Sequence, residues 1–486
     1  MEMNKINYFK YCKSNLVVLG VAVFSLIFFL CSSLRHSWLQ SNAFELGIYD
    51  QVAYLISQGQ TPFSSFLEIH HMGNHAAWVM YPVALLYKIY PDVHWLLLVQ
   101  AVSLSLGALP SWSLARQAGL NNSISWAIAC TYLLYPLVFN VNLFDFHPEV
   151  IALPALLAAI LAARLNKTVW FCAAIILVLS CKAVLSLTVA AMGLWLLFFE
   201  KNRNCGLIAL FLGAGWFLIA TQGVIPYFNQ GREHAGIGRY QYLGKSVLEI
   251  AANLILKPHL ILGRLFSLDT FEYLAFLVFP VIWWISPRHL TPLISAVPML
   301  GMNILSDIPA QRDLIHQYSI PILPFLLVAA IANLSHQNLQ EVKIPQIFDK
   351  KLRIPSLPLS KAIITWSFIA FLCLAKYGYF WTIYLDEINT LPATKEAIFL
   401  VQTTGNVLTT SHIAPHLTHR PVVKLTQADT PPRNLTEFEY VLLNLRYPGW
   451  MSDRNFVQNL VTQLTNNPQF QLKYQRDDIY LFTKKR

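Results

Sequence analysis

The stretch LFDFHPEV places three ionisable residues, Asp145, His147 and Glu149, between two long apolar runs. Carboxylates and an imidazole at such a junction can exchange protons with a substrate or contact its polar groups. Pro148 also suits the first turn of a following helix, and Asp145 or His147 could cap that helix. Because capping does not require three ionisable side chains, the stretch predicts a substrate-binding site that contains Asp145, His147 and Glu149.

A second group of acids lies in ELGIYDQVAYLI, whose apolar spacing predicts an amphipathic helix along a membrane surface. A lipid–water boundary removes water from a carboxylate, and such desolvation favours the protonated form that a general base must reach. We therefore predict Asp50 as the catalytic base and Glu45 as a substrate-binding residue. The alternative is that Asp50 only solvates the polar face of the helix.

The sequence HHMGNH offers His70, His71 and His75 as weak candidates for a metal site. On a helix His71 and His75 would share one face, as zinc ligands often do. Gly73 interrupts the helix, however, and no H-E-x-x-H motif is present. A divalent metal, a contact to phosphate or sugar, and plain interfacial polarity are the alternatives, and His75 is included among the substrate-binding candidates.

Cationic side chains also lie at the ends of apolar runs: Lys182 in SCKAVLSL, and Arg312 and His316 in DIPAQRDLIHQY. Ionisable groups near the end of a transmembrane bundle usually face its interior and mark a substrate path. Arg and Lys can neutralise a phosphate there. Together with the acids, they predict a cavity for a lipid-linked phosphosugar. A carboxylate would take a proton from an acceptor hydroxyl, and the cations or a metal would stabilise the phosphate leaving group.

Composition identifies the elements that must position these residues. The chain has 486 residues, of which 55% are hydrophobic and only 12% charged, and its mean hydropathy is +0.47. A soluble protein has about 25% charged residues, so this chain belongs in a bilayer. The net charge of +10 does not indicate nucleic-acid binding, because the basic residues lie at the ends of apolar runs. The seven cysteines lie in or beside apolar runs without a C-x-x-C motif, which argues against a disulfide framework or a cysteine zinc site.

A transmembrane helix needs about 20 mostly apolar residues, and about eleven stretches qualify. They are 16–34, 93–115, 123–142, 149–165, 168–181, 183–199, 205–222, 271–286, 290–306, 318–335 and 361–383. The run 75–90 is only moderately apolar, and we predict an interfacial or re-entrant helix there. With that choice the positive-inside rule places the N-terminus and the basic linker 336–361 in the cytoplasm. The loops 35–92 and 223–270 then lie outside and carry most of the carboxylates.

From residue 385 the apolar runs shorten to strand length, as in NVLTTS, RPVVKL, EYVLLNL, FQLKY and IYLFT. This change predicts a small α/β domain over 385–486. An odd number of spans places that domain on the extracytoplasmic side. The predicted fold class is therefore an all-α polytopic membrane protein over 1–384, followed by a small extracytoplasmic α/β domain.

Long stretches such as FELGIYDQVAYLISQGQTPFSS, YLLYPLVFNVNLFDFHPEVIALPALLAA and HQYSIPILPFLLVAAI carry a family resemblance. They resemble a bacterial family of predicted membrane proteins, named for domain of unknown function 2079, over most of the chain. That family is similar in layout to the GT-C membrane glycosyltransferases, which use polyprenyl-phosphate sugars. The resemblance implies a GT-C-like fold in which Asp50 is the acid of the first outer loop, and Asp145, His147 and Glu149 belong to the second.

The resemblance also implies a function. It points to a multi-pass protein of the bacterial plasma membrane that transfers a hexosyl or pentosyl group from a polyprenyl-phosphate donor on the extracytoplasmic face. The predicted partners are this donor and membrane lipid, with no nucleic acid, and the acceptor is left open. Family members commonly have Lys-Glu-Asp where this chain has Lys182, Ala183 and Val184, which implies altered specificity or loss of activity. The alternatives are a non-enzymatic transporter or flippase for lipid or polysaccharide, and a metal-dependent membrane hydrolase.

Overall fold

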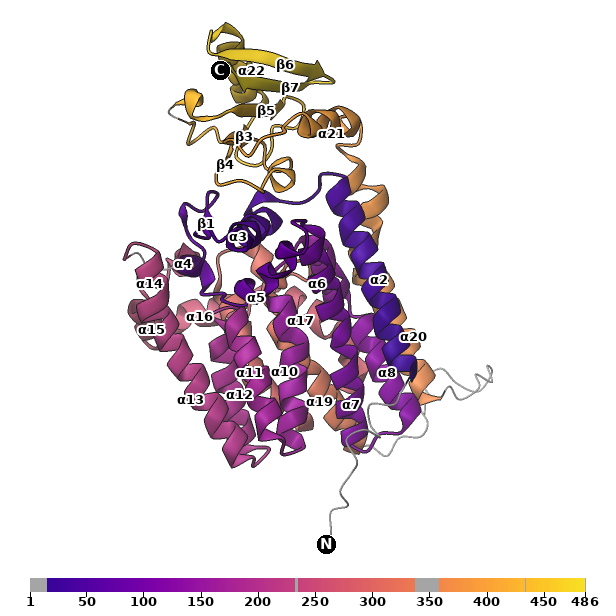
Figure 1. Cartoon of the computed structure of the whole chain (residues 1–486). Coiled ribbons are helices and arrows are strands. Elements are labelled where there is room, and N and C mark those ends of the chain that lie inside the picture. Colours follow the sequence, from indigo (N-terminus) through magenta and orange to yellow (C-terminus); the bar gives the residue numbers. More distant parts are fainter. Residues whose placement is uncertain (1–14, 232–234, 337–357, 433, 486) are drawn as a thin grey trace.

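The computed structural model describes residues 15–231, 235–336, 358–432 and 434–485. The protein is mostly helical (67%) and has a small sheet region at the C-terminus, which confirms the predicted fold class at this level. Most helices run side by side in a bundle, and the sheet stacks on one end of that bundle (Figure 1). We call this end the sheet end and the opposite one the far end.

Five helices are long and apolar enough to cross a membrane, or up to seven if each bent pair counts as one span. The five are α2 (Asn15–Ser37), α6–α7 (His94–Leu106, Ala108–Gln117), α8–α9 (Asn122–Leu133, Pro136–Phe144), α13–η3–α14 (Arg203–Ile219, Ala220–Val224, Ile225–Phe228) and η8–η9–α19 (Pro309–Arg312, Gln317–Ile322, Leu323–His336). The bent pairs are α16 (Pro258–Leu265) with α17–η5 (Leu268–Val278, Phe279–Trp284), and α20 (Leu359–Leu374) with η10–η11 (Lys376–Trp381, Ile383–Leu385).

The remaining helices of the bundle are shorter than a typical span. They are α10 (Glu149–Arg164), α11 (Thr168–Cys181), α12 (Leu185–Phe198), α15 (Val247–Leu256), η6 (Pro287–His289) and η7–α18 (Thr291–Ala296, Val297–Leu305). Because α11 and α12 have only 14 residues each, length and composition identify five to seven spans where the sequence predicts about eleven.

Two breaks between helices, α9–α10 and α11–α12, carry polar residues to the sheet end. Asp145 directly follows α9, and its φ of 145° lies outside the helical region. α10 begins at Glu149, directly after Pro148. α11 ends at Lys182, which is extended, before α12 begins. The turns between these helices therefore bring Asp145, Glu149 and Lys182 to the same end of the bundle.

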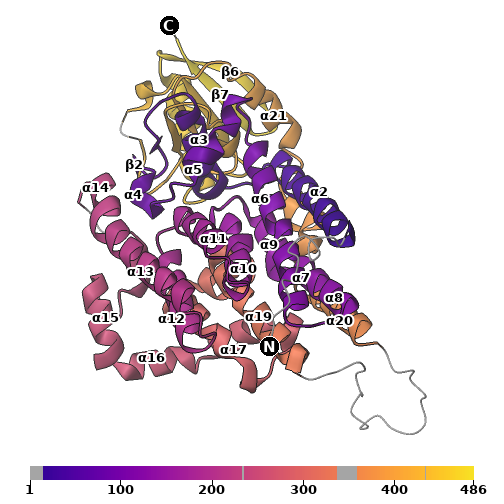
Figure 2. The same ribbon diagram turned by 60° about the horizontal axis from the view of Figure 1, so that its bottom comes forward.

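The chain between α2 and α6 covers the sheet end, and we call residues 38–93 the first-loop cap. Its elements are η1 (Ala43–Gly47), α3 (Ile48–Ser57), β1 (Phe63–Ser64), β2 (Ile69–His70), α4 (Met72–His75), α5 (Met80–Ala84) and η2 (Leu86–Lys88), and β1 pairs with β2 in antiparallel fashion. Figure 2 shows the cap between the bundle and the sheet. Within 75–90 no helix exceeds five residues, so this run is too short in helix to span a membrane.

α3 is largely buried within the protein, whereas its apolar spacing predicts a helix on the membrane surface. We call residues 418–425 the C-terminal clasp, because they cover the side of α3 for which the sequence predicts contact with water. The side-chain amide of Gln51 donates to the carbonyl of Arg420 at 3.1 Å. The backbone N–H of Val423 donates to the Ser65 hydroxyl at 3.0 Å. The remote C-terminal chain thus supplies hydrogen-bond partners that the sequence of the cap could not indicate.

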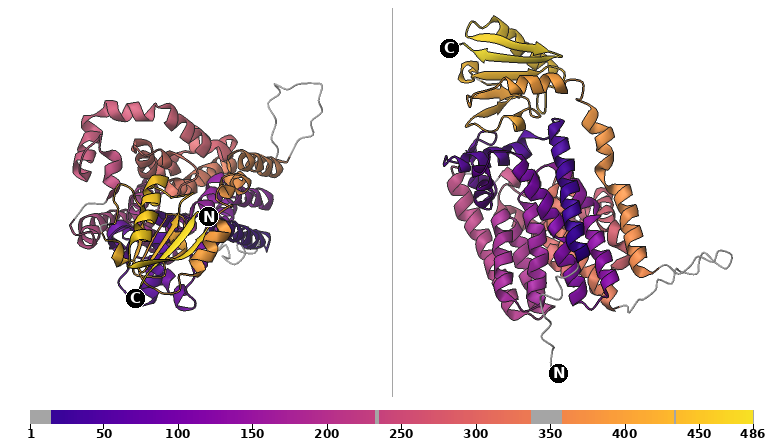
Figure 3. Two further views of the ribbon diagram at one scale, coloured as in Figure 1. Left: turned by 90° about the horizontal axis from the view of Figure 1, so that it is seen from above. Right: turned by 45° about the vertical axis from the view of Figure 1, so that its right-hand side comes forward.

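The predicted outer loop 223–270 is largely helical. After α14 it contains η4 (Ala235–Tyr240), α15 and α16. Figure 3 shows α15 and α16 running around the outside of the bundle. Leu248 and Ile255 are 82% and 81% exposed, so this segment presents apolar side chains to its surroundings, as lipid-facing helices do.

The C-terminal sheet has five strands in the order β4-β3-β5-β7-β6. They are β3 (Val407–Thr409), β4 (Val423–Leu425), β5 (Tyr440–Asn444), β6 (Phe470–Arg476) and β7 (Ile479–Lys484), accompanied by α21 (Leu391–Phe399), η12 (Ala414–His416), η13 (Leu435–Glu437) and α22 (Arg454–Asn466). β3 is parallel to β4 and β5, whereas β7 is antiparallel to β5 and β6. Alternate residues of β5 pack toward α22 and toward α21, which explains why the whole strand is buried.

Candidate functional site

A cavity of about 210 Å³ lies at the sheet end, between the first-loop cap and the ends of the bundle helices. Its charged and titratable lining residues are Glu45, His75, His147, Lys182 and Arg239. They come from η1, α4, the α9–α10 turn, the end of α11 and η4, respectively. Four of these five residues belong to the predicted site, and Arg239 does not.

Glu45 and His147 form a close pair in this cavity. His147 Nε2 contacts Glu45 Oε2, while His147 Nδ1 lies 3.2 Å from the backbone oxygen of Asp145. A backbone oxygen can only accept, so Nδ1 carries a proton and Nε2 shares a proton with the carboxylate. Burial lowers the pKa of His147, but the Glu45 carboxylate outweighs this effect and the pKa is raised overall. The His147 side chain is 2% exposed and that of Glu45 is 27% exposed, so the carboxylate is the more accessible member of the pair.

Lys182 and Glu149 form a second, buried pair. Lys182 Nζ lies 2.5 Å from Glu149 Oε1, and Lys182 also lines the cavity. Glu149 stands at the first position of α10, where the helix dipole favours a negative charge. An ammonium has three N–H donors, so Lys182 can hold Glu149 and still offer a donor to a ligand. Glu149 acts on the cavity through Lys182.

Arg239 is the cavity residue that the sequence did not indicate. Its guanidinium carbon lies 5.2 Å from the centroid of the Tyr318 ring, which also lines the cavity. Within the described ranges Arg239 has no carboxylate in ion-pair distance. It therefore adds a positive charge that no acid of the described chain neutralises. No motif marks Arg239, since it lies in a long segment with several scattered basic residues.

Asp50 does not line the cavity, although Ile48 and Tyr49 beside it do. Its side chain is 0% exposed and accepts hydrogen bonds from the hydroxyls of Tyr87, at 2.5 Å, and Thr418. His419 Nε2 lies 3.3 Å from Asp50 Oδ2. This position corrects the prediction that Asp50 shares a cavity with His147, because the C-terminal clasp encloses the carboxylate.

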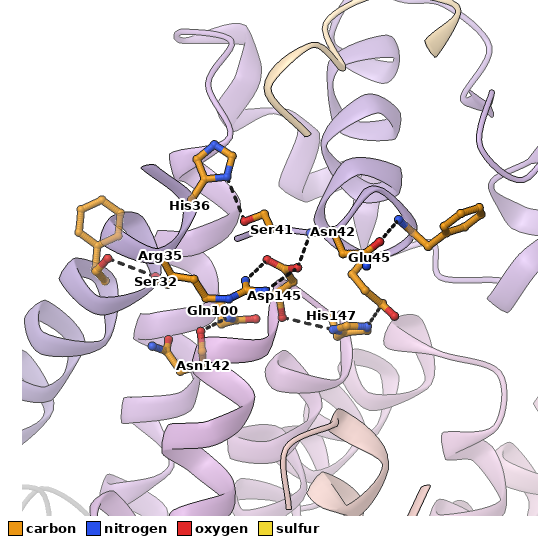
Figure 4. Close-up of polar contacts among 12 residues, drawn as sticks. Ser32, Arg35, His36, Ser41, Asn42, Glu45, Gln100, Asn142, Asp145 and His147 are labelled. Carbon is orange, nitrogen blue, oxygen red and sulfur yellow. Dashed lines mark hydrogen bonds and ion pairs between the residues drawn. The ribbon is translucent and has the colours of Figure 1, made fainter. Parts of the chain in front are cut away.

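Asp145 lies behind the cavity and not in its lining. Its carboxylate contacts Arg35 Nη1 at 2.5 Å and accepts the backbone N–H of Asn42 at 3.0 Å (Figure 4). Burial raises the pKa of Asp145, and the Arg35 guanidinium opposes that shift in part. The expected contact of Asp145 with a substrate is replaced by contacts with the protein itself.

Arg312 and His316 also lie outside the cavity lining. Arg312 donates to the carbonyls of Ile304 and Ser306, and it lies 3.7 Å from Asp269. His316 Nδ1 lies 2.7 Å from Asp313 Oδ2. The ring of His316 meets Phe144 at a centroid distance of 4.3 Å, and Phe144 in turn stacks on His147 at 5.4 Å. His316 therefore contacts the site through the Phe144 ring. Arg312 stabilises a turn by binding backbone carbonyls.

The histidines of HHMGNH do not converge on one point. His70 stacks on Phe228 at a centroid distance of 4.2 Å, and His71 Nε2 bonds the carbonyl of Ala77 at 3.0 Å. Burial lowers the pKa of His71 to about 4. Among the residues with a described position, no group of three or more His, Cys, Asp or Glu side chains could hold a metal ion. The three histidines are therefore not a ligand set, and only His75 reaches the cavity.

Comparison with known protein families shows which family the chain belongs to. The family described as "Predicted membrane protein (DUF2079)" matches residues 35–481. The protein belongs to the DUF2079 family. Among curated proteins, none matches the sequence.

Solved structures show which fold this DUF2079 protein shares. ArnT from Cupriavidus metallidurans in the apo state is 14% identical, covers 96% of this chain and 98% of its own, and has a TM-score of 0.57. ArnT bound to undecaprenyl phosphate is 13% identical, covers 97% and 98%, and has a TM-score of 0.51. Archaeal oligosaccharyltransferase AglB from Archaeoglobus fulgidus, in complex with an inhibitory peptide and a dolichol-phosphate, is 12% identical over 90% and 70%, with a TM-score of 0.41. ArnT is a GT-C glycosyltransferase, and at this identity the likeness shows a shared fold.

Lys182, Ala183 and Val184 follow α11, where the family resemblance implies Lys-Glu-Asp. The backbone N–H of Ala183 donates to the carbonyl of His75 at 2.9 Å. The Ala183 side chain packs in a small apolar cluster with Met72 and other residues. Lys182 finds its carboxylate in Glu149 instead of in the next residue. Lys182 thus lines the cavity, and Ala183 makes an apolar contact where the resemblance implies an acid.

Proposed function

We propose that this protein is a membrane glycosyltransferase that moves a sugar from a polyprenyl-phosphate donor to an acceptor hydroxyl at the cavity of Glu45 and His147. The observation that carries the proposal is the pairing of a carboxylate–histidine couple with two cations, Lys182 and Arg239, in one cavity. The GT-C-like fold supports it, because one of the similar structures holds undecaprenyl phosphate. The fold alone does not specify the reaction.

Glu45 replaces Asp50 as the proposed base. The acceptor hydroxyl gives its proton to the Glu45 carboxylate and its oxygen forms a bond to the anomeric carbon of the sugar. The bond between that carbon and the phosphate oxygen breaks, and polyprenyl phosphate leaves with the electron pair. Lys182 and Arg239 stabilise the negative charge that develops on the leaving phosphate. His147 orients Glu45 through the contact of its Nε2 with Oε2, and the other carboxylate oxygen receives the proton.

We further propose that the cavity opens on the extracytoplasmic side of a bacterial plasma membrane. Arg164, at the C-terminal end of α10, and Arg203, at the start of α13, lie at the far end of the bundle. The positive-inside rule assigns that end to the cytoplasm. Counting α10, α11, α12 and η7–α18 as short spans, beside the five long ones and the two bent pairs, restores the predicted total of about eleven. The first-loop cap and the C-terminal region 385–486, which we propose as a separate domain, then lie outside.

The proposal is tested in proteoliposomes with labelled polyprenyl-phosphate hexoses and pentoses, offered one at a time. Wild-type protein should consume a donor and release polyprenyl phosphate, and Glu45→Gln should lower kcat by about 100-fold or more, because general-base catalysis contributes about 10²–10⁴-fold. Asp429→Asn, which changes an exposed acid of the C-terminal region, is the matched control and should behave like the wild type. Donor that crosses the bilayer without cleavage would identify a transporter instead. Equal rates for Glu45→Gln and wild type would remove Glu45 as the base.

A further inference from the structure

Asp145 has a backbone conformation that side-chain-bearing residues rarely adopt. Its φ and ψ are 145° and 171°. This region is essentially restricted to glycine, so the backbone of Asp145 is strained there. Such a conformation persists only when the surrounding contacts impose it. The residue is 1% exposed, so the contacts that impose it are all within the protein.

Two contacts of the Asp145 carboxylate hold this conformation. Arg35, near the end of α2, places Nη1 and Nη2 2.5 and 3.4 Å from the two carboxylate oxygens. The backbone N–H of Asn42 donates to Oδ2 at 3.0 Å. Arg35 itself lies over the Tyr384 ring, with its guanidinium carbon 5.8 Å from the centroid. The carboxylate is therefore fixed between α2 and the start of the first-loop cap.

The contact with Asn42 leads directly to Glu45. Asn42 is the N-cap of η1, and its side-chain oxygen accepts the N–H of Phe44 at 3.0 Å. Its backbone oxygen accepts the N–H of Glu45 at 3.3 Å. Because η1 is a single π-helical turn, its start determines where Glu45 points. The Asp145 carboxylate thus sets the beginning of the turn that carries the proposed base.

The backbone of Asp145 leads to the other member of the pair. Its carbonyl oxygen lies 3.2 Å from His147 Nδ1, and this hydrogen bond selects the tautomer and the ring orientation. Figure 4 shows the Asp145 carboxylate in contact with Arg35 and Asn42, and the Asp145 carbonyl in contact with His147, which lies next to Glu45. One residue therefore contacts the supports of both Glu45 and His147 without lining the cavity.

We propose that Asp145 is a positioning residue, whose strained backbone and paired carboxylate align Glu45 with His147. This inference rests on the proposed transfer reaction and adds to it the device that assembles the base. The carboxylate sets the start of η1, and the backbone carbonyl aims His147. The two functions of Asp145 can be separated, because a glycine keeps the backbone conformation and loses the carboxylate.

The test uses two variants that both remove the carboxylate and differ in the backbone. In Arg35→Met/Asp145→Gly and Arg35→Met/Asp145→Ala, the buried guanidinium is removed together with its partner, so neither variant leaves a charge unpaired. Glycine tolerates a φ of 145°, whereas alanine does not. We expect kcat to fall about tenfold more in the alanine variant than in the glycine variant, since small misplacements of catalytic groups cost up to about 100-fold. The donor KM should stay unchanged in both, because Asp145 does not line the cavity.

A second measurement does not depend on turnover. In protein labelled with ¹⁵N-histidine, the ring nitrogen signals of His147 report which nitrogen carries a proton, and His147→Gln assigns them. The glycine variant should retain the wild-type Nδ1 signal, which reports the bond to the backbone carbonyl, and the alanine variant should lose it. Identical spectra and identical kcat for the two variants would overturn the positioning role. If the wild type turns over none of the donors, the proposed function fails, and the spectra still decide the role of Asp145.

Discussion

His419 Nε2 lies 3.3 Å from Asp50 Oδ2, so an imidazole of the C-terminal clasp closes on a carboxylate buried in the first-loop cap. The two residues are 369 positions apart in the sequence. The His419 ring also stacks on Tyr54, with a centroid distance of 4.7 Å and an interplanar angle of 6°. Burial lowers the pKa of His419, but Asp50 outweighs this effect and the pKa is raised. The contact joins the C-terminal region to the first-loop cap, which covers the cavity.

The pH dependence of stability follows from the raised pKa of His419. A histidine with a raised folded-state pKa contributes stability that is fully present below its unfolded pKa of about 6.5 and is lost as the pH rises through the folded value. The midpoint of thermal unfolding of the wild type should therefore fall as the pH rises above about 6.5, and it should fall less in His419→Gln. Thermal scans in detergent across this range measure both curves. His259→Gln, at an exposed position of α16, should follow the wild type, and parallel curves for His419→Gln would contradict the assignment.

Asp50→Asn should lower stability and leave donor binding intact. The amide weakens the charge-assisted contact with His419 and faces the Thr418 hydroxyl with a possible donor, which should lower the free energy of unfolding by about 1–3 kcal/mol. The donor KM should not change, because Asp50 lies outside the cavity lining. Denaturant titration and the proteoliposome assay check the two effects. Loss of turnover at unchanged stability would return Asp50 to the role of base.

Arg239→Ala should weaken donor binding. A hydrogen bond from a charged donor is worth about 1.5–3 kcal/mol, which corresponds to a rise in the donor KM of about 10–100-fold. Arg239→Lys should recover part of this loss, because an ammonium keeps the charge without the planar donors. Arg264→Ala is the control, since Arg264 pairs with Asp307 and does not line the cavity. An unchanged KM for Arg239→Ala would place the phosphate elsewhere.

Lys182→Met should destabilise the protein strongly, because it leaves Glu149 buried without its cation. Removing one partner of a buried ion pair costs about 3–5 kcal/mol. The double variant Lys182→Met/Glu149→Gln should recover most of that stability, and both variants should remain impaired in transfer. Denaturant titrations of the detergent-solubilised proteins provide the comparison. If the double variant is as unstable as the single one, Lys182 supports the fold by some contact other than Glu149.

The sequence predicts the parts of the site that lie at helix ends. Asp145, His147 and Glu149 stand in a polar break between apolar runs, and Lys182 stands in another. Such breaks come together at one end of a bundle because consecutive helices run in opposite directions. Short apolar runs of strand length likewise predict β3 to β7. Local patterns are sufficient for these features.

The choice between Glu45 and Asp50 could not be made from local patterns. Glu45 and Asp50 are five positions apart, and this spacing does not place them on one face of a regular α-helix. The π-helical turn at Ala43–Gly47 changes the direction of Glu45 relative to α3. Asp50 is enclosed by Thr418 and His419, which only the folded chain brings near. Arg239 reaches the cavity from a segment without a motif for the same reason. Contacts between distant segments determined the outcome in each case.

The hydrogen bonds that join Gln51 to Arg420, and Ser65 to Val423, have a consequence for the biogenesis of the protein. The ribosome produces the first-loop cap early and the C-terminal clasp near the end of translation. Until the clasp emerges, Gln51 and Ser65 bond to each other but lack their C-terminal partners, and Asp50 lacks two of its three contacts. Maturation of the cavity is therefore a late event in biogenesis, and a chain that stalls before residue 418 lacks these contacts although α2 to α21 have already been synthesised.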